Sequence, residues 1–239
     1  MRLAENIILS LTMNFRIAGT LRFDKGLFSA FLSSPEDPLP AFKGPTPELR
    51  GRSKDHPRYG RWMYAFVKFY KPEIVLEVGT NAGGTAVGIA RALVENKKGR
   101  LICVDNADAE PRSFPAAAEK NIKSTGLESE RFELILGDSK TAVPLLLPRV
   151  KRKLGVYLVD GDHTFEGALA DIENGLPMME PGGFILVHDV DLGLDLGDEA
   201  SPSHPQPVYE ALKETAEKRG LEWCILKFIR KHLGVIQAR

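Results

Sequence analysis

Acidic and imidazole side chains end five short apolar runs of this 239-residue chain. They are Glu77, Asp105, Asp138, Asp160 and the pair His188-Asp189. If the five runs are parallel strands of one sheet, their carboxyl ends meet along one edge, which is where such sheets bind ligands. The sequence therefore predicts a polar rim that can hold a small polar ligand and exchange a proton with it.

The loop after the first run has the composition of a ligand-binding loop. Gly79 can adopt a positive φ or leave the backbone bare, while Gly83 and Gly84 let the following helix approach the strand. Dinucleotide-binding loops carry a glycine where this chain has Asn81, and a carboxylate at Glu77 would repel a diphosphate. The loop therefore favours a cationic ligand.

Strand-like runs alternate with helix-like segments from residue 74 onward. Seven strands are predicted, at residues 74–77, 101–104, 132–136, 155–159, 184–187, 222–228 and 232–237. Between the fourth and fifth, apolar residues at intervals of three and four predict a helix from Phe165 to Met179, followed by a turn at 181–183. Alternation of this kind is typical of parallel sheets covered by helices on both faces. We predict an α/β fold: a Rossmann-like doubly wound seven-stranded sheet, mostly parallel with the last strand antiparallel, and an N-terminal helical extension.

The glycine loop resembles the acidic-x-Gly-x-x-x-Gly loop of class I S-adenosylmethionine (SAM) dependent methyltransferases. The matching residues, at the spacing of that loop, are Glu77, Gly79, Asn81 and Gly83. Many members carry a middle glycine where this chain has Asn81, and Glu-Val-Gly-Thr-Asn is similar to the O-methyltransferase branches. The resemblance implies SAM as the cofactor and adds Thr80 to its binding loop.

Polar residues after the next strands fit the rest of that cofactor. Asp105 can accept hydrogen bonds from both ribose hydroxyls, although NAD enzymes place an acid at the same point. Asp138 and Ser139 suit adenine recognition, because a carboxylate accepts from the exocyclic amine, but Asp138 can equally be an ordinary helix N-cap. Asp160 after the fourth strand is assigned to the cofactor site as well.

A second resemblance lies in residues 158–166, 181–183 and 188–190, which read Leu-Val-Asp-Gly-Asp-His-Thr-Phe-Glu, Pro-Gly-Gly and His-Asp-Val. These segments are similar to the SAM-dependent family that includes sugar and macrolide O-methyltransferases and relatives labelled cephalosporin hydroxylases. With the glycine loop, the similarity covers about residues 72–192. It implies methylation of a hydroxyl group on a small molecule of the sugar or natural-product type.

Several members of that family, and of the related catechol-type enzymes, bind a divalent cation through acids at the ends of the fourth and fifth strands. Carried over, the ligands here would be Asp160 and Asp189, with help from His188. Oxygen ligands suit Mg²⁺, whereas an imidazole shifts the preference toward Mn²⁺, Fe²⁺ or Zn²⁺. The catechol-type pattern has Asp-Asn where this chain has His-Asp, so chemistry without a metal stays open.

Methyl transfer requires that an acceptor oxygen be aligned with the sulfonium of SAM and lose its proton. His163 and His188 are the candidate general bases, because the imidazole pKa lies near neutral pH, and Asp160 completes the predicted catalytic group. A bound cation could instead lower the pKa of the hydroxyl. His163 can also be a helix-start residue with local hydrogen bonds alone.

The amino-acid composition limits which binding partners and which cellular compartment are expected for this protein. Lysine plus arginine equals aspartate plus glutamate, at 32 each, so no net charge attracts nucleic acid. Cys103 and Cys224 lie in apolar runs without a disulfide or zinc pattern, which fits a reducing cytoplasm. Residues 1–19 are predicted as an amphipathic helix that is too short and too polar for a membrane span.

The chain is predicted to divide into an N-terminal extension, residues 1–55, and a methyltransferase domain, residues 56–239. The extension is expected to cap the substrate site, to form a dimer contact or simply to pack against the sheet, and a homodimer is the predicted assembly. Two other functions stay open: an oxidoreductase that uses NAD or iron, and a SAM-binding protein without catalysis. Glu77 and Asn81 argue against NAD, and no compact His-x-Asp motif supports iron.

Overall fold

The computed structural model describes residues 16–33, 56–108, 114–190, 207–226 and 232–239, and the fold is given for these residues. Their strands are β1 (Arg16–Gly19), β2 (Ile74–Val78), β3 (Arg100–Asp105), β4 (Phe132–Leu136), β5 (Leu154–Val159), β6 (Met179–Val190), β7 (Glu222–Leu226) and β8 (His232–Gln237). Their α-helices are α2 (Lys25–Leu32), α3 (His56–Tyr70), α4 (Gly84–Asn96), α5 (Ala116–Lys123), α6 (Ser139–Val150), α7 (Phe165–Gly175) and α8 (Pro207–Lys218). Two 3₁₀ helices are η1 (Ser129–Arg131) and η2 (Leu176–Met178).

All of these strands form one sheet in the order β1-β7-β8-β6-β5-β2-β3-β4. The five strands β2 to β6 pair in parallel, and β8 is antiparallel to both β6 and β7. The sheet predicted from β2 onward, mostly parallel with an antiparallel last strand, is therefore confirmed. β1 adds a further strand, antiparallel to β7 at the edge of the sheet.

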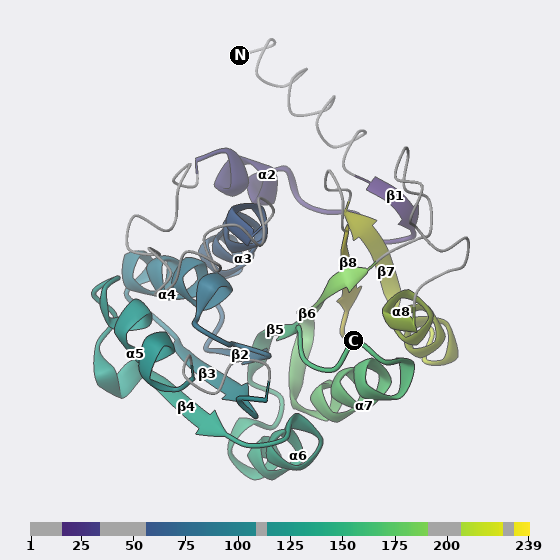
Figure 1. The fold of residues 1–239 in the computed structure, drawn as a ribbon. Coiled ribbons are helices and arrows are strands. Elements are labelled where there is room, and N and C mark those ends of the chain that lie inside the picture. The colour runs from purple at the N-terminus through teal and green to yellow at the C-terminus, as the bar shows by residue number, and fades with distance from the viewer. Residues whose placement is uncertain (1–15, 34–55, 109–113, 191–206, 227–231) are drawn as a thin grey trace, which may run out of the picture.

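Helices cover both faces of the sheet, as Figure 1 shows. α2, α3, α4 and α5 lie on one face, where the aromatic residues Trp62 and Phe66 of α3 are fully buried. α6, α7 and α8 lie on the other face and bury aliphatic residues such as Ile172 and Leu212. Every residue of β2 and β5 is buried, which is the pattern of central parallel strands.

The structure bears on two features of the composition, the cysteines and the apolar segments. Cys103 and Cys224 are both buried and free of disulfide bonds. Across the described ranges, no helix combines the length and the apolar content that crossing a membrane requires. The cytoplasmic location itself stays a prediction.

Two predicted helices are shorter in the structure than the sequence indicated, or give way to a strand. Residues 16–19, assigned to the N-terminal helix, form β1 because they pair with the otherwise open edge of β7. The helix predicted to reach Met179 ends at Gly175, and the 3₁₀ turn η2 follows. Met179 instead begins β6 and pairs with Leu154, so sheet pairing overrides the helical spacing of the apolar residues there.

The turn predicted at 181–183 is built into β6 as an irregular section. Gly182 has φ +82°, and its amide donates to the carbonyl of Ala238 at 2.9 Å. The division of the chain at residue 55 stays a prediction. Several expectations fall outside the described residues, namely those for residues 1–15, 34–55, 191–206 and 227–228.

The point where neighbouring connections diverge lies between β2 and β5. From β2 the chain passes through α4 to β3 on one side, and from β5 it passes through α7 to β6 on the other. Ligands of open parallel sheets bind at such a point, beyond the carboxyl ends of the strands. The predicted polar rim lies at this point, which we call the crevice after the general rule.

Candidate functional site

The loop from β2 to α4 packs against the end of β5 with no room for a side chain at Gly79. Its φ is +81°, and a Cβ there would lie 1.8 Å from the backbone oxygen of Asp160. The Asp160 amide donates to the carbonyl of Val78 at 3.0 Å, and the Gly79 amide donates to that of Val104 at 2.9 Å. Gly79 thus allows the ends of β2, β3 and β5 to close together.

Glu77 lies beneath this loop and not at its mouth. β2 continues past it to Val78, its side chain is fully buried, and it accepts a hydrogen bond from the Thr85 hydroxyl in α4. The Cys103 thiol lies 3.7 Å from its other oxygen. Burial raises the pKa of Glu77 to about 7, against the opposite effect of the Thr85 hydrogen bond. Glu77 ties β2 to α4, and its direct contact with a cofactor stays a prediction.

Asp105 joins the same loop to the end of β3. One carboxylate oxygen accepts from the Asn81 amide at 2.8 Å, and the other accepts from the Ala107 amide at 2.7 Å. Asn81 has φ +47°, so it takes the left-handed conformation that a glycine would adopt without strain. Gly83, at φ +83°, begins α4 without a side-chain cap. The loop thus places an uncapped helix start beside the carboxylate of Asp105.

Asp138 serves as the N-cap of α6. It is exposed, and its Oδ1 accepts from the Lys140 amide at 2.9 Å. This is the simpler of the two roles predicted for it. Ser139 follows in the first turn of α6 and interacts with the buried carboxyl group of Asp171. Recognition of adenine by Asp138 and Ser139 stays a prediction.

Four side chains that can carry charge converge at the ends of β5 and β6, and we call them the acid–imidazole cluster: Asp160, His163, His188 and Asp189. Nδ1 of His188 lies 2.9 Å from Oδ1 of Asp160 and 2.9 Å from Oδ1 of Asp189. Nε2 of His163 lies 3.3 Å from Asp160, and its Nδ1 lies 4.0 Å from Asp189. His188 is buried, whereas the His163 side chain is 50% exposed. The residues predicted as catalytic therefore do meet in space.

Mutual attraction controls the pKa values in this cluster. Burial alone would lower the pKa of His188, but Asp160 and Asp189 raise it to about 10. Burial would raise the pKa of Asp160, but His188 and His163 hold it below its usual value. The hydrogen bond with Asp160 raises the pKa of His163. The buried part of the cluster is thus an imidazolium between two carboxylates.

Tyr59 of α3 covers this cluster, and sequence analysis missed it. Its ring centroid lies 3.7 Å from that of His188, with 40° between the ring planes. Its hydroxyl donates to the carbonyl of His232 at 3.5 Å. The sequence signal that could have indicated Tyr59 is helical spacing, since it lies one turn before Trp62 and both residues are on the buried face of α3. That spacing does not reveal which strand end the ring meets.

Contacts between α6 and the loop after β5 were also missed. Nζ of Lys140 lies 2.9 Å from Oδ2 of Asp162, and this hydrogen bond holds the pKa of Asp162 at about 2. Asp171 of α7 is fully buried behind them. The apolar spacing that predicted α7 concealed Asp171, because an acid on the buried face of a helix carries no pattern of its own.

The structure does not support the metal site predicted at Asp160, Asp189 and His188. The two carboxylates converge on the His188 ring itself. In the described part of the chain, no group of three or more His, Cys, Asp or Glu side chains could hold a metal ion. The geometric reason is that Nδ1 of His188 takes the position between the carboxylates that a cation ligated by both would need.

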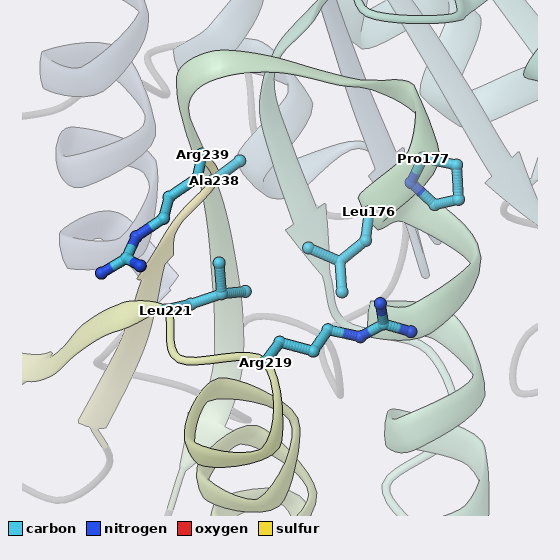
Figure 2. Close-up of a pocket in the computed structure, with 6 residues that line it drawn as sticks. All are labelled: Leu176, Pro177, Arg219, Leu221, Ala238 and Arg239. Atoms are coloured by element: carbon cyan, nitrogen blue, oxygen red, sulfur yellow. The ribbon is translucent and has the colours of Figure 1, made fainter.

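A shallow pocket of about 280 Å³ lies at the opposite edge of the sheet, beyond the amino ends of the parallel strands (Figure 2). Its lining residues are Leu176, Pro177, Arg219, Leu221, Ala238 and Arg239. Figure 2 shows the two leucines between the two guanidinium groups. Arg219 is engaged by Glu173, with Nε 3.0 Å from Oε1. The pocket contains none of the predicted site residues, so the candidate active site is the crevice and not this pocket.

A family model matches the part of the chain that contains the polar residues at the strand ends. Residues 76–190 match a family model described as "Methyltransferase domain". The chain is thus similar to a methyltransferase domain over 115 of its 239 residues. The matched part of the chain contains the glycine loop, Asp105, Asp138 and the acid–imidazole cluster. It excludes α3, so Tyr59 is contributed from outside the matched region.

Proteins with similar sequences are named O-methyltransferases. The transmembrane O-methyltransferase of Homo sapiens is 38% identical over 90 residues, which are 38% of this chain and 29% of that protein. A putative O-methyltransferase of Mycobacterium sp. (strain JLS) is 26% identical over 166 residues, 69% of this chain and 70% of that protein. This chain therefore matches about three tenths of the length of the first relative.

Solved structures of methyltransferases share the fold of this chain. The methyltransferase PaMTH1 of Podospora anserina, bound to S-adenosylhomocysteine (SAH), has a TM-score of 0.62 at 18% identity, covering 100% of this chain and 96% of its own. The O-methyltransferase TomG of Streptomyces achromogenes, in complex with SAM, has a TM-score of 0.60 at 18% identity, covering 98% and 96%. At this level of identity, the likeness establishes the fold.

Proposed function

We propose that this chain transfers the methyl group of SAM to a hydroxyl group of a small molecule, of the sugar or natural-product type. The observation that carries the proposal is the contact between Gly79 and Asp160, which joins the glycine loop to the acid–imidazole cluster at one crevice. The loop suits a cofactor, and the cluster suits an acceptor that must lose a proton. Bound SAM supplies an activated methyl group, so the chain has to align the acceptor and take its proton.

The residues around the glycine loop fit SAM. A Cβ at Gly79 would collide with the backbone of Asp160, so the glycine lets the loop close onto the end of β5 and lie beside the acid–imidazole cluster. The carboxylate of Asp105 binds two backbone amides and keeps lone pairs for the ribose hydroxyls. The uncapped start of α4 suits the carboxylate of the methionine part. Asp138 and Ser139, after β4, are assigned to the adenine.

His163 is the proposed general base. It is half exposed at the rim, where an acceptor hydroxyl can reach it, and Asp160 orients its ring. His188 is buried between two carboxylates under the ring of Tyr59, so we assign it to holding Asp160 in position. The cluster does not fit a divalent cation, and the proposal assigns no step to one.

A thermal melt with SAH tests the cofactor. At a hundred times its dissociation constant, SAH should stabilise the chain by about 2.7 kcal/mol. NAD⁺ serves as the control ligand, and each titration is repeated with Mg²⁺ and with EDTA. We expect a shift with SAH alone that is equal in Mg²⁺ and EDTA. A shift with NAD⁺ and none with SAH would instead favour the oxidoreductase.

Methyl transfer itself is tested by SAH release from SAM with a panel of catechol, sugar and phenolic acceptors. His163→Gln should reduce kcat by about 100-fold or more, while SAH affinity stays unchanged. An unchanged kcat would remove His163 as the base. Binding of SAH without turnover of any acceptor would support the SAM-binding protein without catalysis.

The assembly proposed from the sequence is a homodimer to which residues 1–55 contribute. Sedimentation of the full chain tests it across a range of concentrations. A single species at the monomer mass of 26.4 kDa would refute the dimer and leave the proposed chemistry unaffected.

A further inference from the structure

Asp171 of α7 is a buried acid that the proposed chemistry does not use. Its side chain has no exposed surface. Neither carboxyl oxygen has a hydrogen bond of ordinary geometry among the described residues. Burying such a group costs folding free energy, so its presence has to be explained by something other than packing.

The surroundings of Asp171 come from two loops that flank the crevice. A Cβ placed on Gly161, in the loop after β5, would lie 3.0 Å from Oδ2 of Asp171 and 4.0 Å from Oγ of Ser139, at the start of α6. The carboxyl group therefore lies at the junction of the two loops. The backbone carbonyl of Asp171 accepts from the Tyr157 hydroxyl at 3.1 Å, which anchors this turn of α7 to β5.

A surface contact joins the same two loops. Lys140, next to Ser139, reaches Asp162, next to Gly161, with 2.9 Å between Nζ and Oδ2. Asp162 also accepts from the Thr164 amide at 2.9 Å, which shapes the loop after β5. The loops are thus joined by an exposed ion pair, and the buried carboxyl group of Asp171 lies at their junction.

We propose that Asp171 is a positioning residue of the cofactor site. It holds Gly161 and Ser139 at the separation that the adenosyl part of SAM needs between the loops after β4 and β5. This inference rests on the proposed function and adds a residue that does not touch the ligand. A leucine would fill a similar volume without the desolvation cost of a carboxyl group, so stability alone does not account for an acid here.

SAH titration calorimetry on full-chain variants tests the inference. Asp171→Leu removes the polar group, Asp171→Asn keeps its shape and a hydrogen-bond acceptor, and Thr215→Val is the matched control. Thr215 is also fully buried, and its Oγ1 has no hydrogen bond among the described residues, but it belongs to α8 and not to either loop or to α7.

We expect Asp171→Leu to weaken SAH binding by about tenfold, corresponding to about 1.4 kcal/mol. Its KM for SAM should rise in proportion, with kcat nearly unchanged. Asp171→Asn should stay within about threefold of the unmodified chain, and Thr215→Val should not change the affinity. Circular dichroism checks that each variant is folded, and Asp171→Ala replaces Asp171→Leu if the leucine prevents folding.

Two results would overturn the inference: equal SAH affinity in Asp171→Leu and the unmodified chain, or an equal loss in Asp171→Leu and Thr215→Val. The second result would mean that any change in the core weakens binding. Failure of the unmodified chain to bind SAH is a separate outcome, since it refutes the proposed function before any variant is compared, and the inference falls with it.

Discussion

The two halves of the crevice are held together by different forces. On the β2 side, the loop depends on bare backbone at Gly79 and on amide hydrogen bonds to Asp105. On the β6 side, attraction between the His188 imidazolium and the carboxylates of Asp160 and Asp189 holds the residues, under the ring of Tyr59. The first half is defined by steric limits and the second by charge.

This difference determines which changes each half tolerates. A loop built on bare backbone should fail when one carbon is added, even if no charge changes. An ionic cluster should fail when one charge is removed, even if the shape is kept. We therefore expect the glycine loop to be sensitive to added volume and the acid–imidazole cluster to be sensitive to lost charge, although the backbone of Gly79 contacts that of Asp160.

The largest effect is expected from Gly79→Ala. Its Cβ would collide with the backbone of Asp160 at 1.8 Å, and alanine disfavours φ +81°. We expect a loss of about 4 kcal/mol or more in the free energy of unfolding, measured with urea, together with loss of SAH binding. Gly84→Ala is the control, because a Cβ there meets no atom within 4 Å. A similar loss in both variants would contradict the steric account.

Asp160→Asn should cost about 3 kcal/mol, because it removes one partner from a buried ion pair and keeps the shape. The control is Asp162→Asn, whose partner Lys140 is exposed, and the expected cost is below about 1 kcal/mol. Urea unfolding of both variants gives the comparison. Equal costs would mean that charge does not hold the cluster together.

Asp171→Asn should stabilise the chain at neutral pH. Burial raises the pKa of Asp171 to about 6, and the interaction with Ser139 opposes this rise. Among the nearby charges, Lys140 lowers the pKa, whereas Asp138 and Asp162 raise it. A raised folded-state pKa means that the native state holds the proton more tightly. The contribution of Asp171 to the stability of the unmodified chain is therefore fully present below about pH 4 and is lost as the pH rises through about 6.

The gain from Asp171→Asn should thus be about 2 kcal/mol at pH 7.5 and should disappear near pH 4. Thermal melts of both chains at the two pH values measure it. A gain of the same size at both values would show that ionisation of Asp171 is not the cause.

The smallest effect is expected from Tyr59→Phe. The ring that stacks on His188 is kept, and the lost hydrogen bond to the His232 carbonyl is long, at 3.5 Å. We expect a change below about 1 kcal/mol and an unchanged kcat. Tyr59→Leu, which removes the ring, should cost about 2 kcal/mol and reduce kcat. If the two variants behave alike, the stacking of Tyr59 does not support the cluster.

Most of the fold could be predicted because its signals are local. Each strand from β2 to β8 is an apolar run of its own, and their alternation with helices implies parallel pairing. β1 could not be predicted, because a four-residue segment becomes a strand here by pairing with β7, more than 200 positions away. The end of α7 was missed for the same reason, since Met179 is taken by β6.

The sequence by itself determined which polar residues follow the strands, and hence that Asp105, Asp160 and His188 share one edge of the sheet. The tertiary structure alone decided where their side chains point and what covers them. Glu77 is buried because β2 runs one residue further to Val78 and packs on both faces. Tyr59 and Asp171 reach the crevice by helix packing. The succession of strands along the chain follows from local pattern, whereas side-chain contacts depend on elements that are distant in the sequence and meet only on folding.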